Sequence, residues 1–155
     1  MAFQIHALDP SPYAPLFGLN EQQLAVHNAR RVIATSNPGF PCRVSLADAA
    51  VGESLLLVNH QHLRGSTPYA ASHAIYIREA AEPARIAPNS VPEVLLRRLL
   101  SVRAYDAASM MLDADVVDGR SLAPMLDALF ARDDVAFIHL HNARPGCFAA
   151  SVTRA

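Results

Sequence analysis

The chain has 155 residues, of which 52% are hydrophobic and 17% are charged, and its formal net charge is −1. This length and composition predict one domain over residues 1–155 with a hydrophobic core. The net charge predicts no broad basic surface that would attract nucleic acid. All 13 basic residues are arginine. The absence of lysine excludes imine chemistry on a lysine, the usual attachment of pyridoxal phosphate and the phosphate loop that depends on a lysine.

The sequence also indicates a compartment. Its first residues lack the basic and apolar regions of a secretory signal, and no run approaches the roughly 18 apolar residues of a membrane span. We therefore expect a cytoplasmic protein without a membrane partner. In that compartment thiols stay reduced, so Cys42 and Cys147 are expected not to form a disulfide.

The first half of the chain predicts five short strands and one helix. Alternation and β-branched or apolar runs place the strands at residues 3–8, 31–35, 42–46, 54–60 and 72–79. Asn20 is a good N-cap for the helix, over residues 21–27. In a regular strand over 42–46, Arg43 would point away from Cys42. The strands at 54–60 and 72–79 are expected to pair antiparallel through a long loop.

The second half predicts two more helices and a closing hairpin. Proline and leucine spacing places helices at residues 92–99 and 121–129, and strands are expected at 102–107 and 110–117. Ser121 is the expected N-cap of the second of these helices, and Pro145-Gly146 suits the centre of a type II turn. This order predicts an α+β fold with a mostly antiparallel sheet, two or three short helices and a C-terminal β-hairpin.

The closing hairpin, residues 135–148, carries the densest group of reactive side chains. In a regular strand His139 and His141 share one face, about 7 Å apart at ~3.3 Å per residue, while Asn142 lies on the other face. The loop length decides whether Cys147 joins the histidines, because a slip of one residue reverses the alternation of side chains.

Two catalytic interpretations of the hairpin are open beside a purely structural one. In the first, Cys147 or Cys42 is a nucleophile and a histidine is its base. In the second, the two histidines bind a metal together with a third ligand from His60, His62 or Cys147. The His-x-His spacing alone is common in proteins, so the sequence assigns no metal site. The residues proposed for catalysis are His139, His141 and Cys147.

A third interpretation is the binding of an anionic molecule. Arg43, Arg78 and Arg103 each fall in an expected strand, and three guanidinium groups on one sheet face would form a floor for a carboxylate or phosphate. Tyr105 shares the predicted face of Arg103, and polar residues also stand where the 72–79 strand begins. The residues predicted to bind the ligand are Arg43, Tyr69, Ser72, Arg78, Arg103, Tyr105 and Asn142.

Several segments of the sequence resemble those of one protein family. They are residues 38–46, Pro68-Tyr69 with Ser72, residues 74–78, residues 103–106 and residues 138–148. Together they resemble a bacterial family known as domain of unknown function 1203, over nearly the whole chain. The resemblance implies a stand-alone bacterial protein, and it implies that a functional site is to be sought in these segments. It implies no activity, substrate or cofactor. It also implies that tyrosine is more usual at the position of His60, which argues against His60 as an essential ligand.

The leading expectation is therefore a small cytoplasmic α+β protein that binds a small anionic molecule. The three arginines would hold the anion, and the histidines and Asn142 would supply hydrogen bonds or acid–base chemistry, since histidine titrates near neutral pH. The alternatives are a thiol- or metal-dependent enzyme that acts at the hairpin and a protein–protein interaction module. The sequence predicts no particular cofactor and does not favour a nucleic-acid partner.

Overall fold

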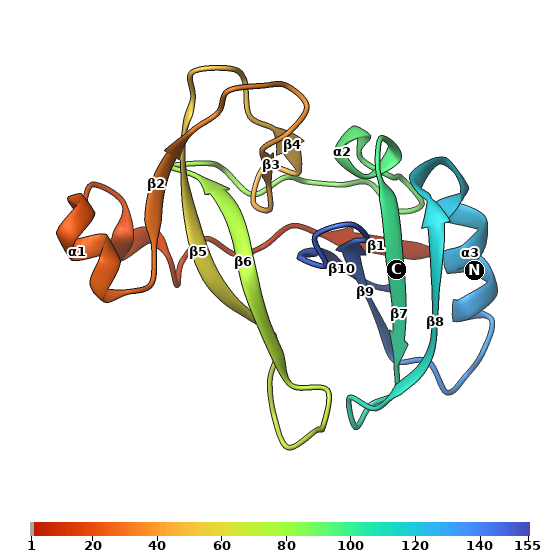
Figure 1. Ribbon diagram of the computed structural model, residues 1–155. Helices are drawn as coiled ribbons and strands as arrows, with labels where there is room; N and C mark the ends of the chain where they lie inside the picture. The colour runs from red at the N-terminus through yellow and green to blue at the C-terminus, as the bar shows by residue number, and fades with distance from the viewer. Residues whose placement is uncertain (1) are drawn as a thin grey trace. The chain divides into compact units, whose positions relative to one another are not determined.

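The computed structural model describes residues 2–155 and contains two five-stranded sheets with short helices (Figure 1). The strands are β1 (Phe3–His6), β2 (Arg30–Ile33), β3 (Pro41–Cys42), β4 (Ala47–Asp48), β5 (Ser54–Leu63), β6 (Ala71–Arg78), β7 (Leu99–Tyr105), β8 (Met111–Asp118), β9 (Phe137–Asn142) and β10 (Phe148–Arg154). The helices are α1 (Glu21–Val26), α2 (Glu93–Leu96) and α3 (Leu122–Phe130), with 3-10 turns η1 (Ala14–Leu16) and η2 (Gly119–Ser121). The predicted α+β class and the C-terminal hairpin of β9 and β10 are confirmed.

One sheet has the strand order β1-β10-β9-β7-β8 and the other β2-β5-β6-β3-β4. Every pair in the first sheet is antiparallel, and in the second sheet β3 pairs with β6 in parallel. Among residues 2–155, no helix is long and apolar enough to cross a membrane.

Contacts between residues divide the chain into two compact units. Unit 1 consists of Met1–His6, Gln61–His73 and Arg85–Ala155, and it contains the first sheet with α2 and α3. Unit 2 consists of Ala7–His60 and Ala74–Ala84, and it contains α1, β2, β3, β4 and the larger parts of β5 and β6. The expectation of one domain over residues 1–155 stays a prediction.

The apolar face of the first sheet forms the core of unit 1. Ile5, Val152, Ile138 and Ala104 are successive cross-strand partners from β1 to β7, and all four are buried. Partners in a sheet point to the same side, so these residues make one continuous apolar surface. Arg154 lies on this side too and donates to the carbonyl of Phe130, which places the C-terminal end of α3 over it. α3 covers the core with its buried residues Leu122, Leu126, Leu129 and Phe130.

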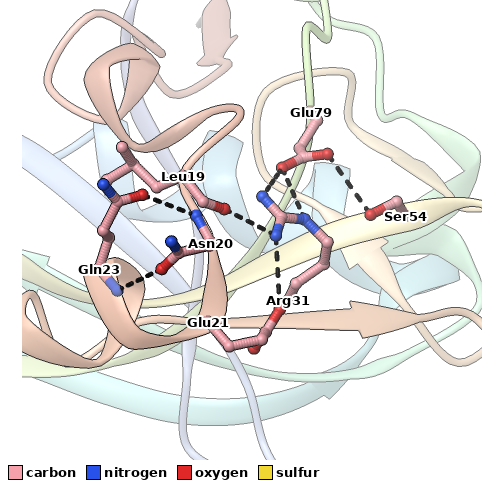
Figure 2. A network of polar contacts seen from close by, with 7 residues as sticks. All are labelled: Leu19, Asn20, Glu21, Gln23, Arg31, Ser54 and Glu79. Carbon is pink, nitrogen blue, oxygen red and sulfur yellow. Dashed lines mark hydrogen bonds and ion pairs between the residues drawn. The ribbon is translucent and has the colours of Figure 1, made fainter.

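In unit 2 a network around Arg31 ties α1 to the second sheet (Figure 2). The Nε and Nη2 atoms of Arg31, on β2, lie 3.1 and 2.7 Å from one carboxylate oxygen of Glu79. Its Nη1 atom donates to the carbonyl of Leu19, 2.9 Å away, just before the helix. Asn20 caps α1 as predicted: it accepts from the backbone of Gln23, whose side chain accepts from the backbone of Asn20.

The predicted strand over 42–46 is wrong. The strand ends at Cys42, residues 43–46 form a turn, and Leu46 has a φ of +47°. Loop segments take up the carbonyls of this turn, since Leu8 donates to Arg43 and Ala84 donates to Val44. The alternation of a strand therefore does not apply here, although Cys42, Val44 and Leu46 are all buried.

Two helix predictions also need correction. The first helix after residue 90 ends at Leu96 rather than Leu99, because Leu99 already pairs with Asp118 in the sheet. Ser121 makes no capping hydrogen bond. Instead the side chain of Asp118 accepts from the backbone of Arg120 and begins the 3-10 turn that leads into α3.

Candidate functional site

The side of the first sheet opposite the apolar core carries polar and aromatic residues. Three cross-strand pairs of β7 and β9 lie there, namely Ser101 with His141, Arg103 with His139, and Tyr105 with Phe137. On β10, Phe148 is the partner of His141. Because partners project to the same side, these seven residues share one surface. We call this surface, together with His62 from the end of β5, the histidine face; its residues are His62, Ser101, Arg103, Tyr105, Phe137, His139, His141 and Phe148.

Three imidazole rings meet on the histidine face. The ring centroid of His62 lies 4.7 Å from that of His141 and 6.0 Å from that of His139. The two rings of β9 are 6.3 Å apart, which confirms that they share a strand face. His62 also stacks on Phe148, with centroids 5.8 Å apart and ring planes inclined by 7°. By contrast, Nδ1 of His60 lies 2.6 Å from the hydroxyl of Tyr13, in unit 2.

Aromatic rings form the other end of the histidine face. Tyr105 stacks on Phe137, with ring centroids 5.1 Å apart, and meets the edge of His139 at 5.5 Å. Tyr69, in the 64–70 loop, packs edge-on against Tyr105 at 6.2 Å. Nearby, Thr67 donates to the carbonyl of Ser109 and so anchors this loop. The predicted residues Tyr69 and Tyr105 therefore lie together.

His141 is the most deeply buried polar group of the face, with 0% of its surface exposed. Burial lowers its pKa to about 3, and the charge of Arg103 acts in the same direction. Nδ1 lies 2.9 Å from the carbonyl oxygen of Gly146, and since a carbonyl only accepts, Nδ1 carries the proton. Nε2 therefore has a lone pair, and it is buried without a hydrogen-bond partner among residues 2–155. Burial also lowers the pKa of His62, followed by the charge of Arg103.

Arg103 is the positive charge of the histidine face. Its Nε atom donates to the hydroxyl of Ser101, 3.1 Å away, and the guanidinium also bonds to Tyr105. Burial nevertheless raises the pKa of the Tyr105 phenol above its ordinary value. Within residues 2–155 the partners of Arg103 are thus hydroxyl groups, and no carboxylate neutralises it. The face combines a guanidinium with neutral imidazoles, an arrangement that suits an anion.

The hairpin turn differs from the prediction. The chain reverses over four residues, 143–146, and not over a two-residue type II turn at Pro145-Gly146. The backbone of Gly146, whose φ is +80°, donates to Asn142 at 2.8 Å, and the backbone of Asn142 donates to Cys147 at 2.9 Å. This loop length sets the orientation of Cys147, which sequence reasoning left open.

Cys147 lies with Asn142, on the side of β9 opposite to the histidines. The amide nitrogen of Asn142 is 3.5 Å from the Cys147 sulfur, and Asn142 directly follows His141 in the strand. Both cysteines are buried, and they form no disulfide. Within the described chain, no group of three or more histidine, cysteine, aspartate or glutamate side chains is arranged to hold a metal ion.

The other predicted arginines lie in unit 2. Arg43 is only 2% exposed, stands in the turn after β3 and donates to the carbonyl of Pro41. Arg78 ends β6 and forms an ion pair of 3.1 Å with Glu53. Ser72 is an exposed residue near the start of β6. Five of the predicted residues lie together on the histidine face and the adjoining 64–70 loop, namely Tyr69, Arg103, Tyr105, His139 and His141.

Sequence reasoning did not assign Ser101, Phe137 or Phe148 to a site, and it treated His62 only as one possible third metal ligand. The parity of residues 101, 103 and 105 was a usable signal, because a strand must place them on one side. The register of β7 against β9 was not visible in the sequence, and this register makes Ser101 the neighbour of His141.

A comparison with protein families gives one match. The model of the family described as Protein of unknown function (DUF1203) matches residues 39–154, which include every residue of the histidine face. Neither the curated proteins nor the solved structures gave a significant match. The chain therefore belongs to the DUF1203 family.

Proposed function

We propose that the histidine face binds a small anionic molecule, with Arg103 as its counter-charge. The observation that carries this proposal is the set of partners of Arg103, which consists of the hydroxyl of Ser101 and the phenol of Tyr105. Two hydroxyls orient a guanidinium without neutralising it, so its charge remains available to a carboxylate or phosphate. Arg43 and Arg78 have partners within unit 2 and are not needed for this site.

The surroundings of Arg103 strengthen the expected attraction. Aromatic rings line the face, and they lower the local dielectric in which a charge pair interacts. The pKa values of His62 and His141 are both lowered by burial, so these imidazoles stay neutral near pH 7 and act as hydrogen-bonding groups. An anion would therefore meet one fixed positive charge and neutral polar rings.

The position of Cys147 gives no support to the thiol-dependent alternative at the hairpin. Its sulfur is next to Asn142, on the side away from the imidazoles. A general base must lie within hydrogen-bond reach of the thiol that it activates, whereas the alternation of β9 places Asn142, the neighbour of this thiol, away from His139 and His141. The histidine face is the better candidate for a site.

The test is calorimetric titration with phenylacetate, a carboxylate with an aromatic ring, and with phenylacetamide, its neutral counterpart. We expect saturable binding of phenylacetate and at least tenfold weaker binding of phenylacetamide, because a charge-assisted hydrogen bond contributes about 1.5–3 kcal/mol. Arg103→Gln should weaken phenylacetate binding about tenfold or more. Arg144→Gln, which removes an exposed arginine of the hairpin turn, should leave it unchanged.

Two results would refute the proposal. One is equal affinity for phenylacetate and phenylacetamide. The other is unchanged phenylacetate binding in an Arg103→Gln protein whose thermal unfolding shows that it is folded. Arg103→Lys is a useful third variant, because it keeps the charge and should retain part of the affinity.

A further inference from the structure

The buried Nε2 atom of His141 constrains what the histidine face can bind. Because Nδ1 donates its proton to Gly146, Nε2 can only accept a hydrogen bond. It is buried and has no partner among the described residues. Buried polar atoms in proteins are almost always paired, and an exception requires an explanation. A bound molecule that donates a hydrogen bond to Nε2 would explain this exception.

Protonation of His141 does not remove the unpaired acceptor at Nε2. Its ring is buried beside Arg103 and His62, and its pKa is about 3, so the imidazolium form is not populated near neutral pH. The groups that act on its ring from the neighbouring strands are the guanidinium on β7 and the imidazoles on β5 and β9. None of them is an acid that would stabilise the charged form.

The guanidinium of Arg103 contacts both ends of the face, through Ser101 and through Tyr105. Its Nε atom donates to Ser101, and Ser101 is the direct cross-strand partner of His141. Direct partners have Cβ atoms about 4.5–5.5 Å apart. An anionic group held by Arg103 would thus lie near Nε2 of His141. Only a short link between the two groups of the bound molecule would be needed.

We infer that the molecule is a 2-hydroxycarboxylate, whose carboxylate pairs with Arg103 and whose neighbouring hydroxyl donates to Nε2 of His141. This inference rests on the proposed anion site and adds the hydroxyl donor to it. A plain carboxylate satisfies Arg103 but leaves the histidine acceptor unpaired. Nδ1 of His62 is also buried and has no partner among residues 2–155, and its ring is edge-on to His141. When this nitrogen carries the proton, it can donate to the oxygen of the same hydroxyl group.

The test compares acids that differ by one hydroxyl, namely mandelate with phenylacetate and lactate with propionate. In the wild-type protein each hydroxy acid should bind about tenfold more tightly than its partner acid. In His141→Asn this ratio should fall to about one, because the acceptor for the additional hydroxyl group is gone. Asparagine suits this purpose because its amide can still donate to the carbonyl of Gly146 but has no atom at the position of Nε2.

The outcomes separate this inference from the anion site itself. If both acids of each pair bind equally and Arg103→Gln weakens both, the hydroxyl inference is overturned and the anion site stands. If none of the four acids binds, both fail. Nitrogen NMR of the wild-type imidazoles covers the case in which His141→Asn does not fold: mandelate must move the Nε2 resonance of His141 more than phenylacetate does. Equal shifts with the two acids would overturn the inference.

Discussion

Lowering the pH from 7.5 to 5 should destabilise the protein by about 2 kcal/mol through His141 alone. The buried ring has a pKa of about 3 in the folded chain and an ordinary value of 6.5 when exposed. Between these values the unfolded chain holds a proton that the folded chain does not. The free energy of unfolding therefore falls as the pH falls, by about 1.4 kcal/mol per pH unit once the pH is well below 6.5.

The loss of stability through His141 occurs between pH 7.5 and pH 5, which is above the pH range in which the carboxylates take up protons. Asp9, Glu53 and Asp134 have lowered pKa values because of hydrogen bonds and ion pairs, and their contribution is lost only near and below their ordinary values of 3.8 and 4.5. Most of the change above pH 5 thus belongs to histidines. His62, whose pKa is also lowered, adds to it in the same direction.

Urea unfolding measured at intervals from pH 7.5 to pH 5 checks this prediction. His141→Asn should remove about 2 kcal/mol of the acid-induced loss, because one titrating group is gone from the unfolded chain. His27→Asn is the matched control for the substitution itself, since His27 is exposed at the end of α1. An unaltered pH dependence in His141→Asn would show that His141 is not a buried neutral ring.

Gly119→Ala should destabilise the protein by about 3 kcal/mol, which is the upper range for a steric clash in a packed region. A Cβ atom at Gly119 would lie 1.9 Å from the carbonyl oxygen of Leu95 and 2.8 Å from the Cα atom of Leu96. These are backbone atoms of α2, and they cannot rotate away as a side chain can. The backbone nitrogen of Gly119 also donates to Arg98, 2.8 Å away, which fixes this approach.

Gly18→Ala is the control for the glycine prediction. Gly18 has a φ of +80°, and a Cβ atom there would meet nothing within 4 Å. The control carries only the cost of left-handed backbone, about 1 kcal/mol. Midpoints of urea unfolding compare the two variants. If Gly119→Ala were no less stable than Gly18→Ala, the close approach of Gly119 to α2 would be refuted.

The local features of the fold followed from the sequence because they depend on neighbouring residues. Asn20 caps α1 through its own turn, and the alternation of β9 alone places His139 and His141 on one side. Features that depend on distant partners were missed. Residues 43–46 read as a strand but form a turn, and their carbonyls bond to backbone nitrogens of Leu8 and Ala84, far away in the chain.

The same distinction explains the prediction of the site. Arg103, Tyr105 and the two histidines of β9 were predicted as site residues on separate strands, and the register between β7 and β9 makes them neighbours. The side on which Cys147 lies depends on a four-residue turn that no residue type specifies. The tautomer of His141 depends on the carbonyl of Gly146, which becomes a partner only once that turn has formed.

The central claim is that an anion binds at Arg103 beside a neutral His141. Titration of phenylacetate into nitrogen-labelled protein at pH 7, followed by NMR of the arginine Nε–H and histidine ring nitrogens, tests it most directly. We expect His141 to show a protonated Nδ1 and an unprotonated Nε2, and the Nε–H signal of Arg103 to shift in a saturable way, together with the ring signals of His141. A charged His141 ring, or an Arg103 signal that does not respond to phenylacetate, would contradict the account.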